Sequence, residues 1–338
     1  MILCKRKVFF LFSFLLLTTS NSFGQDAHFS QFYANPLYMN PAFTGTINCP
    51  RISFNFRDQW PSIPKNFITF SGSYDQHINA LHGGIGVLLS ADIEGSGGIL
   101  QNYTAGVIYN FRVQVTRQFN LQFALQGSYL FSSLNWDKLQ FASDWVNPLA
   151  PPEQLSNLND KLSQFDVSVG VVGYTPYLYF GLAVHHLLPI KMNSLRHPTE
   201  KWGLKWTAHV GGKITINQKR KDELRFGDIF LYPNVIFISQ GKFHYLHEGF
   251  YFSFYPFTIG AWLRHNFSNL DAFIMTCGIE YKIFRIGYSY DFNLTKLERS
   301  GGAHEISLQF TIPCHNDKVH EAPKGRNNRL SPIPCPRF

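Results

Sequence analysis

The chain has 338 residues, of which 15% are charged and 16% aromatic, and its formal net charge at pH 7 is +8. So many aromatic residues exclude disorder as the main state, because disordered chains lack them. The mean hydropathy of −0.11 is too polar for a bundle of membrane-spanning helices, each of which needs about 20 consecutive apolar residues. An aromatic-rich chain with few charges and a low hydropathy is typical of a β-barrel whose strands alternate.

Residues 1–24 have the layout of a secretory signal peptide. Basic residues at 5–7 precede an apolar run at 8–17, and a small-residue end follows at Gly24. The apolar run is about half the length of a membrane-spanning helix, which argues against an uncleaved anchor. Cleavage would leave Gln25 as the first mature residue. It would also lower the formal net charge from +8 to +5, because the signal carries three basic and no acidic residues.

A segment with two Asn-Pro pairs, at 35–36 and 40–41, lies between the signal and the first expected strand, over residues 25–50. Each proline fixes its own backbone and moves the preceding asparagine out of helical geometry. We expect each asparagine side chain to bond the backbone beyond it in an Asx-type turn, and Gly45 to supply a conformation closed to other residues. The segment is either a rigid entry peptide or a plug or docking segment.

The start of this segment reads Q-D-x-x-F-S-Q-F-x-x-N-P-L-x-x-N-P-A-F-x-G over residues 25–45. The residues that carry the motif are Gln25, Asp26, Phe29, Ser30, Gln31, Asn35, Pro36, Asn40, Pro41 and Gly45. The motif resembles the mature N-terminus of the PorP/SprF family of Bacteroidetes outer-membrane proteins. The similarity continues more loosely to about residue 313.

This resemblance implies an integral outer-membrane barrel in the type IX secretion and gliding-motility machinery, with no enzymatic activity and no cofactor. The implied partners are the translocon and its periplasmic ring of lipoproteins. Some members also serve one secreted adhesin or other cargo, which they help to export or to keep at the surface. The alternatives are an outer-membrane transport channel for a small or hydrophobic ligand and a soluble secreted β-protein.

From residue 51 the sequence alternates apolar and polar residues in segments of about ten, each followed by a turn. In the last segment, for example, Ile306 and Leu308 share one face and Glu305 and Ser307 share the other. We expect fourteen strands, at 51–60, 67–76, 82–91, 99–114, 118–136, 163–175, 177–188, 202–217, 228–239, 241–255, 257–267, 270–281, 283–293 and 303–312. Their lengths suit tilted membrane strands. The even number suits a closed bacterial barrel with no unpaired edge.

A soluble β-sandwich also alternates, but the long strands and the many Phe and Tyr residues favour a barrel with its apolar face toward lipid. The lumen would then hold charges of both signs, which favours salt-bridged packing over an ion-selective pore. The expected lumenal charges are Arg57, Arg112, Lys205, Lys213, Arg264 and Arg285 with Asp75, Asp166, Glu280, Asp291 and Glu305.

Loop lengths predict the orientation of the barrel. With the mature N-terminus in the periplasm, the two longest connections, 137–162 and 189–201, face outward, and we expect them to meet cargo or adhesin. Tight turns such as 175–176 then face the periplasm. The basic turn 218–227 would be unusually long for that side and, with residues 25–45, would face the translocon. Acidic residues interrupt this basic turn and no aromatic ladder accompanies it, so no nucleic-acid partner is expected.

Two cysteines flank the expected barrel. Cys49 precedes the first strand and Cys314 follows the last, so closure would bring them to one rim and predicts a disulfide across the seam. Cys314 with Cys335 is the rival pairing. Cys277 falls on the expected lipid face as a small apolar residue. The proline-containing tail, 314–338, has no periodicity and is expected to be disordered.

Candidate catalytic and metal motifs fail on geometry. Residues 244–248 contain two histidines but not the H-E-x-x-H order, and on a strand His244 and His247 point to opposite faces. His185 and His186 are likewise expected to point oppositely. We therefore expect no enzymatic activity and no metal site.

Overall fold

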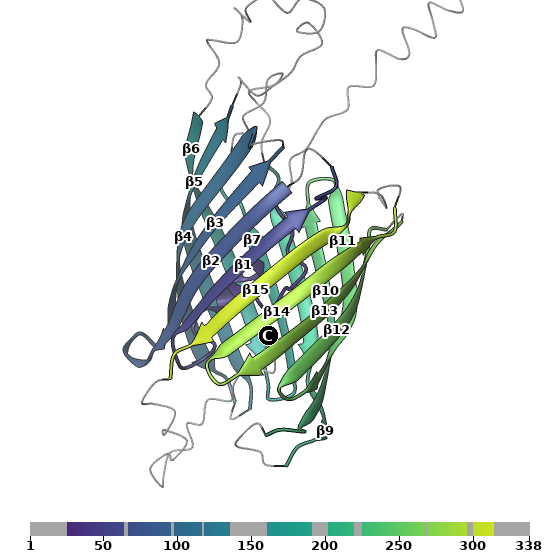
Figure 1. Ribbon diagram of the computed structural model, residues 1–338. Helices are drawn as coiled ribbons and strands as arrows, with labels where there is room; N and C mark the ends of the chain where they lie inside the picture. The colour runs from purple at the N-terminus through teal and green to yellow at the C-terminus, as the bar shows by residue number, and fades with distance from the viewer. Residues whose placement is uncertain are drawn as a thin grey trace, which may run out of the picture.

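The computed structural model describes residues 26–63, 67–95, 98–116, 118–135, 161–190, 202–219, 225–267, 269–295 and 300–313. Within this part of the chain the strands form one closed antiparallel barrel (Figure 1). The N-terminal segment that precedes the first strand lies inside it.

The strands follow one another around the barrel in chain order. Their bounds are β1 Arg51–Gln59, β2 Phe67–Ile78, β3 Gly83–Glu94, β4 Leu100–Gln114, β5 Asn120–Leu134, β6 Lys161–Tyr174, β7 Leu178–His185, β8 Lys205–Gly212, β9 Ile214–Asn217, β10 Ile229–Gln240, β11 Phe243–Phe254, β12 Phe257–His265, β13 Leu270–Tyr281, β14 Phe284–Asn293 and β15 Ala303–Thr311. Because β8 and β9 both pair with the same edge of β10, they fill one strand position, and the barrel has fourteen positions, as predicted.

Closure is made between the first and last strands. The ladder between β1 and β15 runs without a break from Arg51 opposite Thr311 to Gln59 opposite Ala303. On the far side β10 pairs with both β8 and β11. Among the described strands only the short β9, which pairs with β10 alone, has an open edge. The others are paired on both sides, as a sheet in lipid needs, because unpaired backbone groups find no water there.

Burial is inverted relative to a water-soluble protein. On β15, Ile306 is 49% exposed while its neighbour Glu305 is fully buried, and the same alternation runs along the other strands. The outward face is therefore an apolar, aromatic-rich surface that suits lipid. Cys277 lies on this exposed face, as expected. Among the described residues, no helix has the length and hydropathy to cross a membrane.

The two rims of the barrel differ in their connections. One, at the bottom of Figure 1, carries the turns 79–82, 115–119, 175–177, 255–256 and 282–283. We call it the short-turn rim. The opposite long-loop rim receives the strand ends that flank the connections 135–160 and 186–204. The described parts of the basic turn 218–227 lie at the short-turn rim, where the Gly227 amide donates to the Tyr255 carbonyl. This asymmetry confirms the expected pattern of loop lengths.

Two of the strand ends that differ from the prediction lie beside the lumenal cavity described below. β7 ends at His185, three residues early, because His186 adopts a left-handed backbone (φ 62°). That turn places both histidines at the lumen, so the expectation that they point oppositely is wrong. β3, expected to end at residue 91, continues to Glu94. The expected end is too early, because Asp92 still pairs in register with Thr69 and Asn102.

Candidate functional site: a plug inside the barrel

Residues 26–46 form a plug in the lumen, which contains α2 (Pro36–Met39) and η1 (Pro41–Phe43). Each short helix begins with a proline at its first position, where the missing N–H costs nothing. The Asn40 side chain accepts a hydrogen bond from the Ala42 amide at 2.9 Å, which confirms the Asx-type turn there. Asn35 makes no such cap, so that expectation is wrong; its Oδ1 accepts from the Ser71 hydroxyl at 3.3 Å instead.

Aromatic side chains of the plug pack against rings on the barrel wall. The Phe32 ring meets His247 edge-on at 4.7 Å between centroids and lies 5.3 Å from Trp262. Tyr33 meets the ring of Tyr251 edge-on at 6.1 Å. All of these side chains are buried. Of the alternatives left open by the sequence, the structure therefore has the plug.

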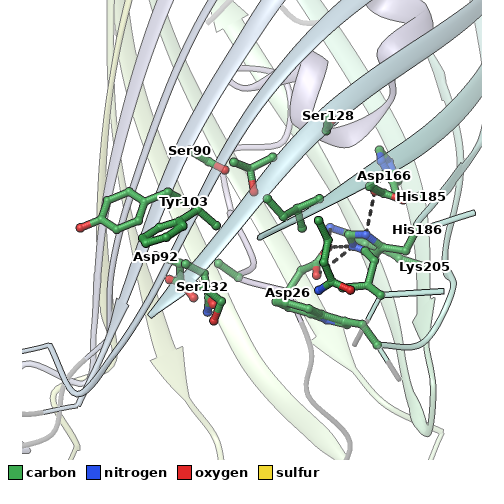
Figure 2. A pocket seen from close by; sticks show the side chains of 18 of the residues that line it. Asp26, Ser90, Asp92, Tyr103, Ser128, Ser132, Asp166, His185, His186 and Lys205 are labelled. Carbon is green, nitrogen blue, oxygen red and sulfur yellow. Dashed lines mark hydrogen bonds and ion pairs between the residues drawn. The ribbon is translucent and has the colours of Figure 1, made fainter. Parts of the chain in front are cut away.

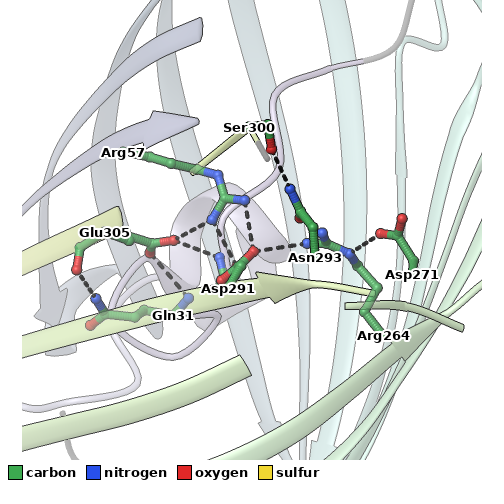
Figure 3. A network of polar contacts seen from close by, with 9 residues as sticks. Gln31, Arg57, Arg264, Asp271, Asp291, Asn293, Ser300 and Glu305 are labelled. Carbon is green, nitrogen blue, oxygen red and sulfur yellow. Dashed lines mark hydrogen bonds and ion pairs between the residues drawn. The ribbon is translucent and has the colours of Figure 1, made fainter. Parts of the chain in front are cut away.

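A buried charge network joins the barrel seam to the plug (Figure 3). The Arg57 guanidinium on β1 donates to Asp291 Oδ2 on β14 at 2.8 Å and to Glu305 Oε2 on β15 at 3.2 Å. Arg264 on β12 donates to the same Asp291 oxygen at 3.1 Å. We call Arg57, Asp291 and Glu305 the seam triad.

The family-motif residues Ser30 and Gln31 bind this seam triad directly. Their backbone amides donate to the two carboxylate oxygens of Glu305, at 2.6 and 3.0 Å. The Ser30 hydroxyl accepts from Arg57 and donates to Asp291, both at 2.8 Å. The Gln31 side chain donates to the Glu305 carbonyl at 2.9 Å and accepts from Ser307 at 2.6 Å. A buried ion network is stable only when its oxygens and protons find such partners, so the plug completes the seam.

At the short-turn rim the plug ends in a second set of contacts. Arg51 binds Asp75 through two parallel hydrogen bonds of 2.7 and 3.0 Å. Asp75 also accepts from the Gly45 amide at 2.8 Å, and Arg112 donates to the Gly45 carbonyl at 2.6 Å. Gly45 has φ 64°, as its role in the motif predicted, and a Cβ there would lie 2.6 Å from the Gly84 Cα.

The middle of the plug is held through Asn40. Its amide nitrogen donates to the carbonyls of Val171 and Leu182 at 3.2 Å and lies 3.1 Å from a ring nitrogen of His209. Gly170 leaves room for this amide, because a Cβ there would lie 2.1 Å from the Asn40 oxygen. The second Asn-Pro pair is therefore a contact point with β6, β7 and β8.

The described start of the plug, Asp26, lies at the long-loop rim, opposite the rim at which the plug joins β1. The expected position of the mature N-terminus, Gln25, lies outside the described residues and stays a prediction. The Asp26 carboxylate accepts from Lys205 at 3.0 Å and from Gln240 at 3.1 Å, and it pairs with His186 at 3.0 Å. The chain thus passes down the whole lumen before entering β1. The orientation of the barrel, with the long connections outward, stays a prediction.

Charges decide the protonation at this end of the plug. Burial alone would raise the pKa of Asp26, but His186 and Lys205 hold that pKa well below its usual range. Burial alone would lower the pKa of His186, yet Asp26 and Asp166 outweigh it and raise that pKa from 6.5 to about 9. The histidine, which lies beyond the end of β7, is therefore protonated at neutral pH and acts as a cation.

The expected lumenal charges point inward, and they pair rather than line a pore. The buried ones are Arg57, Arg112, Lys205, Arg264, Arg285, Asp75, Asp166, Asp291 and Glu305. Lys213 and Glu280 lie at the short-turn rim and are partly buried. Arg285 bonds Glu280 at 3.1 Å, and mixed charges favour packing, as predicted. Arg51 and His186 were missed: Arg51 opens its strand, and His186 looked lipid-facing under strict alternation.

The structure places most of the remaining motif residues, cysteines and histidines named in the sequence analysis. Phe29, Pro36 and Pro41 are buried in the plug, whereas Gln25 lies outside the described residues. Cys49 is disulfide-bonded; Cys314 also lies outside the described residues, so its pairing with Cys49 stays a prediction. His244 and His247 do face opposite sides of β11. The described ranges hold no group of three or more His, Cys, Asp or Glu side chains suited to a metal ion.

A family model described as type IX secretion system membrane protein PorP/SprF matches residues 21–310. The chain belongs to the PorP/SprF family. The match includes the whole plug and nearly the whole barrel, so this member is an outer-membrane β-barrel of the type IX secretion system with its lumen occupied by its own N-terminal segment.

Solved structures with a similar fold are outer-membrane barrels. The P. putida toluene transporter TodX has a TM-score of 0.48 at 9% identity, covering 82% of this chain and 93% of that chain. The Ralstonia pickettii toluene transporter TbuX has a TM-score of 0.47 at 9% identity, with the same coverage of both chains. The Acinetobacter baumannii outer membrane protein Omp33 has a TM-score of 0.43 at 7% identity, covering 80% of this chain and 100% of that chain. No curated protein matches the chain. At these scores the similarities carry no inference about ligands.

Proposed function

We propose that this PorP/SprF protein is a non-enzymatic component of the type IX secretion and gliding-motility machinery that helps to export a cargo or adhesin or to anchor it at the cell surface. The observation that carries the proposal is the family match, which spans plug and barrel together. The plug supports it, because a lumen filled by bonded side chains suits a scaffold for partners better than an open pore.

The two rims suggest where partners bind. We propose the outward connections 137–162 and 189–201 as the surface for cargo or adhesin, since their flanking strands end at the long-loop rim. The translocon and its ring lipoproteins would meet the short-turn rim, where the basic turn 218–227 lies. The plug reaches that rim at Gly45, so a partner bound there would touch both the barrel and the end of the plug.

The test combines co-purification with surface proteomics. The tagged protein, gently solubilised from outer membranes, should bring down translocon lipoproteins or one dominant surface protein, and an unrelated tagged barrel should not. Deleting the gene should remove that surface protein from the cells, and re-expression should restore it. A version with 218–227 replaced by a two-residue turn should still reach the membrane but lose the lipoproteins.

The competing function is a transport channel for a small or hydrophobic ligand. It predicts a partner-free barrel and unchanged surface proteins in the deletion strain. It also predicts ion conduction or ligand uptake when the purified protein is reconstituted alone. That set of results would overturn the secretion proposal.

A further inference from the structure

A cavity of about 370 Å³ lies in the lumen beside the plug, toward the long-loop rim (Figure 2). Strands β2 to β6 form one wall, and the plug contributes Asp26 and Tyr38. The volume is in the range of small-molecule pockets. Leu88, Leu100 and Leu130 give the wall apolar stretches between its polar groups.

Two carboxyl groups face this cavity without a cation. Asp92 and Glu94 lie two residues apart on β3 and therefore on one face of the strand. Asp92 accepts a hydrogen bond from the Thr69 hydroxyl at 2.6 Å, and Glu94 one from the Asn102 amide at 3.5 Å. Neither forms an ion pair with any described residue. Asp92 and Glu94 hydrogen-bond to each other, which limits the repulsion between the two groups, and a bound cation would relieve the rest.

Two further acceptors in the same cavity have no partner, although their side chains are more than nine-tenths buried. Gln126 and Asp166 are 4% and 3% exposed, and Gln126 Oε1 and Asp166 Oδ1 accept no hydrogen bond from the described residues. The Gln126 nitrogen donates to the Ser128 hydroxyl at 2.9 Å, which fixes the amide with its oxygen unused. Leaving such buried acceptors unpaired costs about 1–3 kcal/mol each, so both oxygens are open to a donor from a ligand. The same lining also holds one buried donor without a partner among the described residues, the Trp202 Nε1–H.

The carboxyl and amide oxygens that face the cavity are spread along the lumen rather than gathered at one point. Asp92 on β3 pairs in register with Asn102 on β4, which in turn pairs with Ser132 on β5. Asp166 on β6 pairs in register with Ser128 on β5, and Gln126 lies two residues from Ser128 on β5, toward the short-turn rim. At about 3.3 Å per residue this row extends over roughly 20 Å. Figure 2 shows Asp92 and Ser132 on one side of the cavity and Asp166 on the other.

Charge balance points to a cationic ligand. Four carboxyl groups line the cavity, Asp26, Asp92, Glu94 and Asp166, against two cations, His186 and Lys205. Because Asp92 and Glu94 share one proton through their hydrogen bond, three negative charges face two positive ones. Both cations are already bound, His186 to Asp26 and Asp166, and Lys205 to Asp26. The whole chain is formally +8, so this local excess of negative charge is opposite in sign to the rest of the protein.

We propose that this cavity binds an extended aliphatic ligand that carries ammonium groups, either a free linear polyamine or a lysine-bearing stretch of polypeptide. A primary ammonium group, as on lysine, offers three donors and no acceptor, and a secondary ammonium group within a polyamine offers two, which matches the row of acceptor oxygens. The methylene segments between the charges would pack on the leucines. The inference rests on the cavity alone and does not depend on the role in secretion.

The test is calorimetric titration of the purified full-length protein in an uncharged detergent at low salt. Spermine is the probe, 1,4-diaminobutane the short analogue and hexaethylene glycol the long uncharged control. Spermine should bind, diaminobutane should bind more weakly because it cannot reach along the row, and the glycol should not bind. To distinguish the two sources, an acetylated Lys-Gly-Lys amide is compared with its norleucine counterpart, and binding of either spermine or the lysine peptide supports the proposal.

Variants assign the binding to the cavity. The double change Asp92→Asn with Glu94→Gln should weaken spermine binding at least about tenfold, since hydrogen bonds to charged groups are lost. Glu248→Gln, the same change at an exposed carboxyl on β11, should leave the affinity unchanged. Gln126→Met provides a second variant in case the double variant does not fold, and should weaken binding severalfold. Equal affinity in all variants, binding of the glycol, or no binding of any amine would overturn the proposal.

Discussion

Two sides of the same lumen differ in how their charges are satisfied. On the side of the seam, every carboxylate of the triad is bonded by an arginine and by the plug. On the side of β3 to β6, Asp92 and Glu94 have no cation, and Gln126 and Asp166 each keep an unused oxygen. Asp291 Oδ1 and Arg57 Nε at the seam also have no partner among the described residues, so the difference lies in the cations. Each carboxylate of the triad has an arginine, whereas Asp92 and Glu94 have no described cation and are available to a cationic ligand.

Substitutions at the seam triad should lower the free energy of unfolding more than those at the other sites considered below. Arg57→Met would remove the cation between Asp291 and Glu305, both fully buried, and should lower the free energy of unfolding by about 3–5 kcal/mol. Denaturant titration in lipid vesicles, followed by tryptophan fluorescence, measures this change. Arg57→Lys keeps the positive charge and should lower the free energy of unfolding by less than Arg57→Met does. If both variants lowered the free energy of unfolding only slightly and by the same amount, the seam triad would not hold the plug.

The contact at the plug's start should make stability depend on pH. Because the pKa of His186 is raised to about 9 in the folded protein, its stabilising contribution is complete below about pH 6.5 and disappears as the pH rises through 9. The shift corresponds to at most about 3 kcal/mol. Unfolding free energies at pH 6 and pH 10 should therefore differ more in the native protein than in His186→Gln. The same pH dependence in both proteins would remove His186 from the account.

A single methyl group should test the close approach of plug and barrel at the short-turn rim. Gly45→Ala should cost about 1–3 kcal/mol of unfolding free energy, because the residue has a positive φ and its Cβ would meet the Gly84 backbone. Gly127→Ala is the matched control, since nothing lies within 4 Å of a Cβ there. Equal effects of the two changes would show that the plug does not pack against β3.

The cavity side should tolerate neutralisation. Asp92→Asn and Glu94→Gln should each change the free energy of unfolding by less than about 0.5 kcal/mol, or increase it slightly, because no ion pair is broken and a repulsion is removed. The same denaturant titration measures this. A loss comparable with that of Arg57→Met would mean that the two sides of the lumen do not differ.

The barrel was predictable from the sequence because a period of two fixes which side chains face lipid. Strand order, closure and the inward charges followed from that period and from the even number of segments. The plug position was not predictable, since residues 26–46 have no periodicity and their partners, such as Ser307 for Gln31, lie up to 276 residues away. The cavity was missed because the expected strand 82–91 ended before Asp92 and Glu94, which belong to β3. His186 was missed because its left-handed backbone reverses the direction of its side chain.

The central claim is that the N-terminal motif lies inside its own barrel, and photo-crosslinking in intact cells tests it most directly. A benzophenone amino acid replaces Phe32, whose ring lies between His247 and Trp262. After illumination, mass spectrometry should find the cross-link within the same chain, on β11 or β12. Cross-links that reach only other proteins would contradict the account, because they would place the motif outside the barrel.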